Sequence, residues 1–170
     1  MTNLPEPWLR GPVPAIPALL QPAAHAFIMA REDVGVAVAG LTSDQLWNEP
    51  GGIASAGFHL AHLTGSTDRL LTYARGESLS DTQRQMLARE RTLRTERPAL
   101  DDLIAAWRDM VTRALEQLSS TPEDTLLQPR LVGRLQLRST VLGLLFHAAE
   151  HAARHTGQIV TTSKLVRELG

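Results

Sequence analysis

The chain has 170 residues, of which 43% are hydrophobic and 21% charged, and its formal net charge is −1. This composition is ordinary for one folded domain, and the charge balance gives no reason to expect nucleic acid or an anionic membrane as a partner. The sequence contains no cysteine, which excludes disulfides, thiolate zinc sites and cysteine nucleophiles.

Proline dominates the first 22 residues, which we interpret as an extended N-terminal arm of a single domain spanning residues 1–170. The arm contains Pro5, Pro7, Pro12, Pro14, Pro17 and Pro22. It has neither the basic nor the apolar region of a signal peptide, and no apolar run in the chain approaches the ~20 residues that cross a bilayer. We therefore expect a cytoplasmic protein.

Four segments carry apolar residues at helical spacing. We expect helices over about 23–39 and 53–74, a third that begins after Pro98 and runs through Leu118, and a fourth from about 139 to 168. Residues 41–47 read as a short turn capped by Thr42 or Ser43, and Ser80 is placed to cap a helix over 83–90 within the polar connector. The loop from 119 to 137 has room for one extended piece at 131–137.

These elements predict an all-α protein, a four-helix bundle, because no series of strands is present. The short link between the first two helices suggests that they are antiparallel neighbours. The long connector between the second and third helices permits a crossover, which would let these two run parallel.

Five of the six histidines fall in two of the predicted helices. The second helix carries His59 and His62, and the fourth carries His147, His151 and His155. Each step of four residues turns a helix by about 400° and advances it by about 6 Å, so adjacent histidines of the fourth helix can face one ion. His147 and His155 are about 12 Å apart along the axis, too far to share an ion easily.

Two imidazoles four residues apart form a bidentate platform for zinc, nickel or a similar ion, and a facing helix can supply the third ligand. Three histidine ligands leave a coordination position for water or substrate, as in catalytic sites. The competing interpretation is that these histidines are ordinary packing or surface residues. His25 has no partner in the sequence, and we expect it to be packed or solvated.

Two blocks resemble the signature motifs of the DinB-like superfamily, which includes the DinB proteins and the metal-dependent low-molecular-weight-thiol transferases. They are IASAGFHLAHLTGSTDRLL at 53–71 and EHAARHTGQI at 150–159. The resemblance implies a four-helix bundle of up-down-down-up topology that binds a divalent ion, zinc or nickel. By motif, the ligands it implies are His62, His151 and His155.

Other residues of these blocks have no role that the resemblance supplies. For His59 and His147 we favour a structural role, with catalytic proton transfer as the alternative. Ser66 or Asp68 is placed to orient a ligand. Gly157 lies inside a predicted helix, where glycine is costly, and we expect another helix to approach it closely.

Two functions remain open. The first is a metal-dependent enzyme, a thiol S-transferase or a hydrolase, which would act on a small-molecule thiol and an electrophile or on an ester; Phe27, Trp107 and Met110 would then form apolar walls opposite the ligands. The second is a non-catalytic metal- or ligand-binding stress-response protein. An open pocket beside the ion favours the first. We also expect a homodimer, with Trp8, Trp47 and the arm available for the contact.

Overall fold

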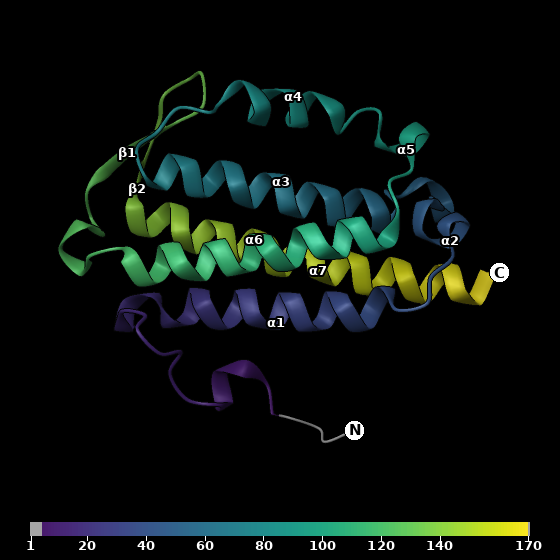
Figure 1. Ribbon diagram of the computed structural model, residues 1–170, viewed down its shortest axis with the longest axis horizontal. Coiled ribbons are helices and arrows are strands. Elements are labelled where there is room, and N and C mark those ends of the chain that lie inside the picture. The colour runs from purple at the N-terminus through teal and green to yellow at the C-terminus, as the bar shows by residue number, and fades with distance from the viewer. Residues whose placement is uncertain (1–4, 170) are drawn as a thin grey trace.

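Four long helices make up most of the computed structural model, which describes residues 5–169 (Figure 1). They are α1 (Gln21–Val38), α3 (Ala56–Ala74), α6 (Leu100–Ser120) and α7 (Val141–Leu169). The shorter helices and the hairpin are η1 (Pro7–Leu9), η2 (Ala18–Leu20), α2 (Ser43–Trp47), η3 (Pro50–Gly52), α4 (Asp81–Arg89), α5 (Leu93–Glu96), η4 (Glu123–Thr125), β1 (Pro129–Val132) and β2 (Leu137–Thr140). The prediction of an all-α protein with little strand is confirmed.

The long helices pack in a ring, in which α1 and α3 each contact both α6 and α7. The first two long helices are therefore diagonal, and the expectation that they are neighbours was wrong. The link between them includes α2, which packs on both α3 and α7 and so carries the chain across the end of the bundle. In Figure 1, α3 and α6 both run from the α2 end toward the hairpin, and the connector containing α4 and α5 returns the chain between them.

Polar side chains at the predicted positions begin the helices. The Thr42 hydroxyl accepts a hydrogen bond from the Gln45 amide to start α2, and Ser80 does the same with Gln83 to start α4. The connector helix is thus confirmed. The second long helix begins at Ala56 rather than at Ile53, because Ser55 is its cap and accepts from the Phe58 amide.

The extended piece predicted at 131–137 is displaced. Strands β1 and β2 pair antiparallel, and the turn between them falls in the middle of the predicted segment. Two residues in this turn, Gly133 (φ 67°) and Gln136 (φ 50°), adopt left-handed backbone conformations, which ends the extended run.

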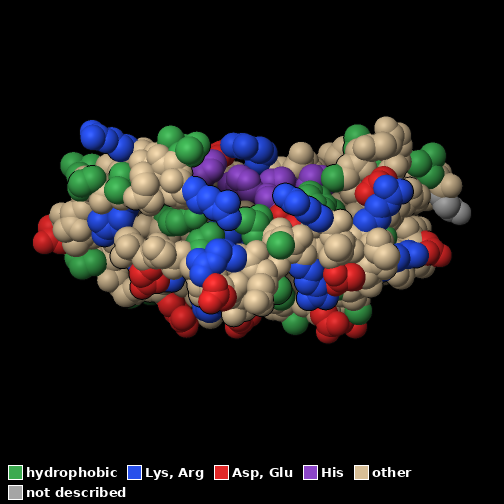
Figure 2. Space-filling view, turned by 90° about the horizontal axis from the view of Figure 1, so that it is seen from above, with side chains coloured by type: hydrophobic (Ala, Val, Ile, Leu, Met, Phe, Trp, Pro, Cys, Tyr) green, Lys and Arg blue, Asp and Glu red, His purple; other side chains and the backbone are tan. Residues whose placement is uncertain are grey.

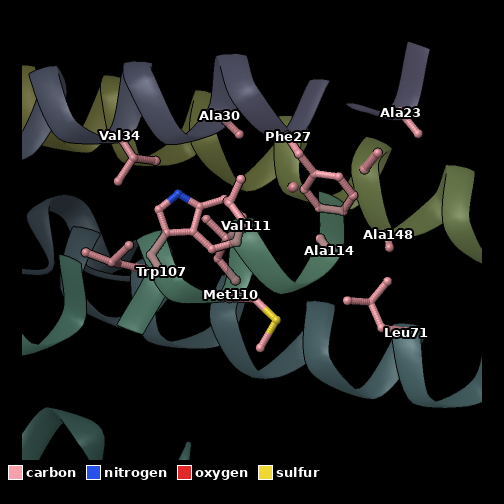
Figure 3. Close-up of a cluster of buried hydrophobic side chains, with 14 of the residues drawn as sticks. Ala23, Phe27, Ala30, Val34, Leu71, Trp107, Met110, Val111, Ala114 and Ala148 are labelled. Atoms are coloured by element: carbon pink, nitrogen blue, oxygen red, sulfur yellow. The ribbon is translucent and has the colours of Figure 1, made fainter. Parts of the chain in front are cut away.

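The interior of the bundle is filled by apolar side chains from α1, α6 and their neighbours (Figure 3). Phe27 and Trp107 are fully buried there. Trp47 is also buried, and its indole nitrogen donates to the Pro98 carbonyl at 3.2 Å. It is therefore unavailable for contact with a second copy, contrary to our expectation. Trp8 is 59% exposed, whereas residues 1–4 of the arm lie outside the described residues.

Within residues 5–169, no helix combines the length and the apolar character that a bilayer crossing requires. Several polar contacts hold the arm against α1, among them hydrogen bonds between Gln21 and the backbone of Val13 and Ile16. Arg10 forms an ion pair with Glu32, and the Nε2 atom of His25 lies 3.0 Å from the Gly11 carbonyl oxygen. His25 therefore has a local structural contact, far in sequence from the other five histidines.

Candidate metal centre

The packing of α3 on α7 brings together histidines from the two predicted blocks. One nitrogen atom from each of His62, His151 and His155 lies within 4.8 Å of the other two. The ring centroids of His151 and His155 are 4.4 Å apart, and those of His62 and His155 are 4.8 Å apart. In Figure 2 the histidine side chains gather in a row on one face, bordered by lysine or arginine side chains. These three could hold one metal ion.

The i, i+4 spacing on α7 explains why two of the three histidines lie together, because it places His151 and His155 on the same helix face. His147 lies one turn earlier, with its ring centroid 5.6 Å from that of His151. Its side chain is 47% exposed, and its Nδ1 atom lies 3.3 Å from a Glu150 carboxylate oxygen. His147 thus borders the three-histidine cluster without belonging to it.

Each of the three imidazoles has a polar partner at its Nδ1 atom. Nδ1 of His62 lies 2.8 Å from Oε2 of Glu90, and Nδ1 of His155 lies 3.1 Å from Nδ1 of His59. Nδ1 of His151 lies 3.4 Å from the Ser66 hydroxyl, which itself donates to the Leu63 carbonyl. The Nε2 atoms have no hydrogen-bond partner among residues 5–169, so they are the atoms available to an ion.

This pattern fits a metal centre, in which each histidine ligand donates its second ring N–H to a neighbouring acceptor. The acceptors here are a carboxylate, a hydroxyl and a second imidazole, and they come from three different positions in the chain. Of the two candidates for orienting a ligand, Ser66 has that contact. Asp68 instead accepts from Gln83 and Arg113.

The electrostatic environment favours neutral imidazoles. Burial and the neighbouring His62 lower the pKa of His151 to about 4, and burial and the neighbouring His151 lower the pKa of His155 to about 4. Burial also lowers the pKa of His59. Near neutral pH these rings keep the lone pair that a metal ligand needs.

Glu90 is the contact that the sequence did not indicate. Burial raises the pKa of its carboxyl, but hydrogen bonding from His62 and the charge of Arg69 outweigh this, and the pKa is lowered overall. The residue follows α4, in a connector that the sequence marks only as polar. Nothing in its local sequence distinguishes it from the other acidic residues, because its role depends on how α4 packs against α3.

A cleft of about 530 Å³ lies near the cluster, and two of the residues that line it, Phe58 and Glu90, contact His62. The Phe58 ring stacks on the His62 ring at a centroid distance of 5.7 Å and an interplanar angle of 8°, and Glu90 bonds to the same ring. Phe58, Leu87 and Ala88 are the apolar residues of this cleft, and the three residues predicted as walls do not line it. Phe27 and Trp107 lie in the core, and Met110 lines a separate cavity of about 430 Å³ between α3, α4 and α6.

Two further details concern the outer surface of the second block. Glu150 and Arg154, four residues apart on α7, form an ion pair at 2.5 Å. The expectation of a close helix approach at Gly157 was wrong, since it is exposed and a Cβ atom added there would have no neighbour within 4 Å.

Comparison with known proteins gives one result that identifies the family. No curated protein matches the chain. The family model described as the DinB superfamily matches residues 26–159, a span that includes the whole three-histidine cluster and both motif blocks. The resemblance expected from those blocks is confirmed, and the chain belongs to the DinB superfamily.

Proposed function

We propose that this protein is a divalent-metal-dependent enzyme that holds zinc or nickel through the Nε2 atoms of His62, His151 and His155. The observation that carries the proposal is the convergence of these three imidazoles, each with a polar partner at its Nδ1 atom. The order and direction of the four long helices support the up-down-down-up bundle topology as part of the same proposal (Figure 1).

The open cleft favours catalysis over simple metal storage. When bound, a divalent ion supplies Lewis acidity, which lowers the pKa of a coordinated water or thiol toward neutrality. Three protein ligands leave a coordination position free. The cleft lined by Phe58 and Glu90, which both contact His62, provides space for a substrate.

We infer different roles for the two histidines outside the triad. His59 is 7% exposed and in contact with the ring of His155, so it is suited to orienting that ligand. His147 is exposed to solvent beside His151, and we assign it the transfer of the proton that the nucleophile loses. Glu150 contacts the His147 ring and limits its rotation.

The reaction class that we propose is S-transfer. The S–H bond of a small-molecule thiol breaks and its proton passes to His147, while the sulfur forms a bond to the electrophilic carbon. The bond from that carbon to its leaving group breaks at the same time, and the leaving group departs with the bonding electrons and takes up a proton from His147 or solvent. Hydrolysis would use water as the nucleophile in the same cleft.

The test combines metal analysis with two assays. Purified wild type should contain about one divalent ion per chain and should conjugate a thiol to a model electrophile or hydrolyse an ester, in each case reversibly inhibited by chelator. H62A should lose both metal and activity, whereas the matched control H25A should keep them, because the hydrogen bond of His25 is to Gly11 of the arm. Metal without activity in the wild type would favour the non-catalytic stress-response alternative, and no metal would overturn the site.

A further inference from the structure

The carboxylate of Glu90 bridges a metal-site histidine and an arginine on the same helix. Its Oε2 atom lies 2.8 Å from Nδ1 of His62, and its Oε1 atom lies 2.9 Å from Nη1 of Arg69. The side chains of Glu90, His62 and Arg69 are only 15%, 22% and 11% exposed. Both carboxylate oxygens are therefore engaged in a partly dehydrated setting, where charge-assisted hydrogen bonds are strong.

The backbone of α3 leaves space for this bridge. A Cβ atom added at Gly65 would lie 3.0 Å from Nη1 of Arg69 and 3.3 Å from Oε1 of Glu90. A larger residue at this position would press on both partners. The glycine thus lets the Glu90 carboxylate and the Arg69 guanidinium meet directly against the helix.

The position of Glu90 is set by the docking of α4 and not by closeness in sequence, since 28 residues separate it from His62. Near the start of α4, the Gln83 side chain donates to Asp68 and to Thr72 on α3, at 2.7 Å in both cases. Glu90 provides the second attachment, just after the other end of α4. The connector is therefore fastened to α3 at two points, one of which is the candidate metal ligand.

A carboxylate is an acceptor only, so the bond to Glu90 requires the proton of a neutral His62 to be on Nδ1. The lone pair is then on Nε2, the atom left free for the ion. Without Glu90 the proton can move to Nε2, and the ring would have to change tautomer before it could ligate through that atom.

We propose that Glu90 is a positioning residue of the metal centre, which holds His62 as its Nδ1–H tautomer and so strengthens divalent-ion binding by the three-histidine cluster. The effect of Glu90 on metal affinity rests on the proposed function, whereas the tautomer of His62 is a property of the metal-free protein. Because linkage is reciprocal, a bound ion should also strengthen the docking of α4 on α3.

The first experiment reads the tautomer directly. Long-range ¹H–¹⁵N spectra of the histidine rings would be recorded at pH 8 on metal-free wild type, E90Q and E96Q. Arg69 can only donate, so the single amide oxygen of E90Q should stay on Arg69 and its NH2 group should face Nδ1 of His62. That NH2 group needs an acceptor, so E90Q should show His62 shifted toward the Nε2–H form. Glu96 lies in the same connector but contacts Arg89 and Thr92, so E96Q should match the wild type. An unchanged His62 tautomer in a folded E90Q would overturn the inference.

The second experiment measures zinc affinity by competition with a chromophoric chelator. E90Q should bind zinc roughly 10-fold or more weakly than wild type, as expected when the acceptor behind a histidine ligand is lost, while E96Q should be unchanged. Equal affinities for E90Q and wild type would reject the role of Glu90 in binding. Wild type that binds no zinc would instead overturn the proposed function, and the tautomer result would still decide the role of Glu90.

Discussion

The Nδ1 atoms of His59 and His155 lie 3.1 Å apart, although 96 residues separate them in the sequence. A hydrogen bond between two ring nitrogens requires one donor and one acceptor, so one of the two rings must be unprotonated at Nδ1. If Nε2 of His155 serves the ion, its Nδ1 carries the proton and donates the hydrogen bond to Nδ1 of His59. A residue without a role in the motif thereby becomes the orienting partner of a ligand.

Replacing His59 should weaken the metal site without removing a ligand. H59F fills a similar volume but leaves Nδ1 of His155 without an acceptor, so we expect zinc affinity to fall roughly 10-fold. Isothermal titration or chelator competition measures this directly. The His147 ring lies outside the hydrogen-bond set of the triad, and H147A should keep wild-type affinity as the matched control. Equal affinity in H59F would remove His59 from the metal centre.

Activity should separate His147 from the ligands. H147A should bind zinc normally but lose thiol-transfer or hydrolytic rate by about 10²-fold or more, the usual contribution of a proton-transfer group. H151A and H155A should lose both properties, because each removes a ligand. Retention of full stoichiometric metal by the triple variant H62A/H151A/H155A would show that the ligands are other residues.

The metal-free protein should lose stability as the pH falls from 6.5 toward 4. His151 and His155 have a pKa of about 4 when folded, against an ordinary value of 6.5. Between these values the unfolded chain binds protons that the folded chain does not, so unfolding is favoured progressively; above pH 6.5 the stability is fully present. Urea midpoints at pH 7.5 and 5 in the presence of chelator measure the effect.

The matched control for this pH dependence is H151A/H155A, which lacks both depressed histidines. Its urea midpoint should fall less over the same pH interval than that of the wild type, since the remaining carboxylates contribute equally to both proteins. Parallel pH profiles for the two proteins would contradict the assignment of these low pKa values.

Two glycines should respond oppositely to replacement by alanine. Gly157 is exposed on α7 with open space around it, so G157A should raise the free energy of unfolding by about 1 kcal/mol through helix propensity. A Cβ atom at Gly57 would lie 2.9 Å from Cε2 of buried Trp47, so G57A should lower it by about 1–3 kcal/mol through overpacking. Chemical denaturation measures both, and effects of the same sign would contradict this packing.

Self-association remains a prediction, now resting on the arm rather than on Trp47. The exposed arm carries Trp8 at 59% and Leu9 at 56% exposure. Light scattering at micromolar concentration should give a dimer that is weakened in W8S, because the apolar contact would be lost. A monomeric wild type would reject it.

Local sequence determined the features that depend on neighbours within a few residues. Helical periodicity indicated the long helices, and hydroxyl residues at 42–43 and at 80 marked helix starts. The spacing of His151 and His155 placed two imidazoles on one face. These inferences work because helix hydrogen bonds, caps and i, i+4 contacts are all short-range.

Tertiary packing decided the rest. The apolar faces of four helices pack into one core, and this packing places α1 and α3 on a diagonal. It also fixes how each helix is rotated, so that Phe27 is buried in the core while Phe58 stacks on His62 beside the cleft. Likewise, the sequence marks Glu90 only as one acid in a polar connector. It becomes a partner of His62 because α4 docks on α3, and no short-range pattern encodes a contact across 28 residues.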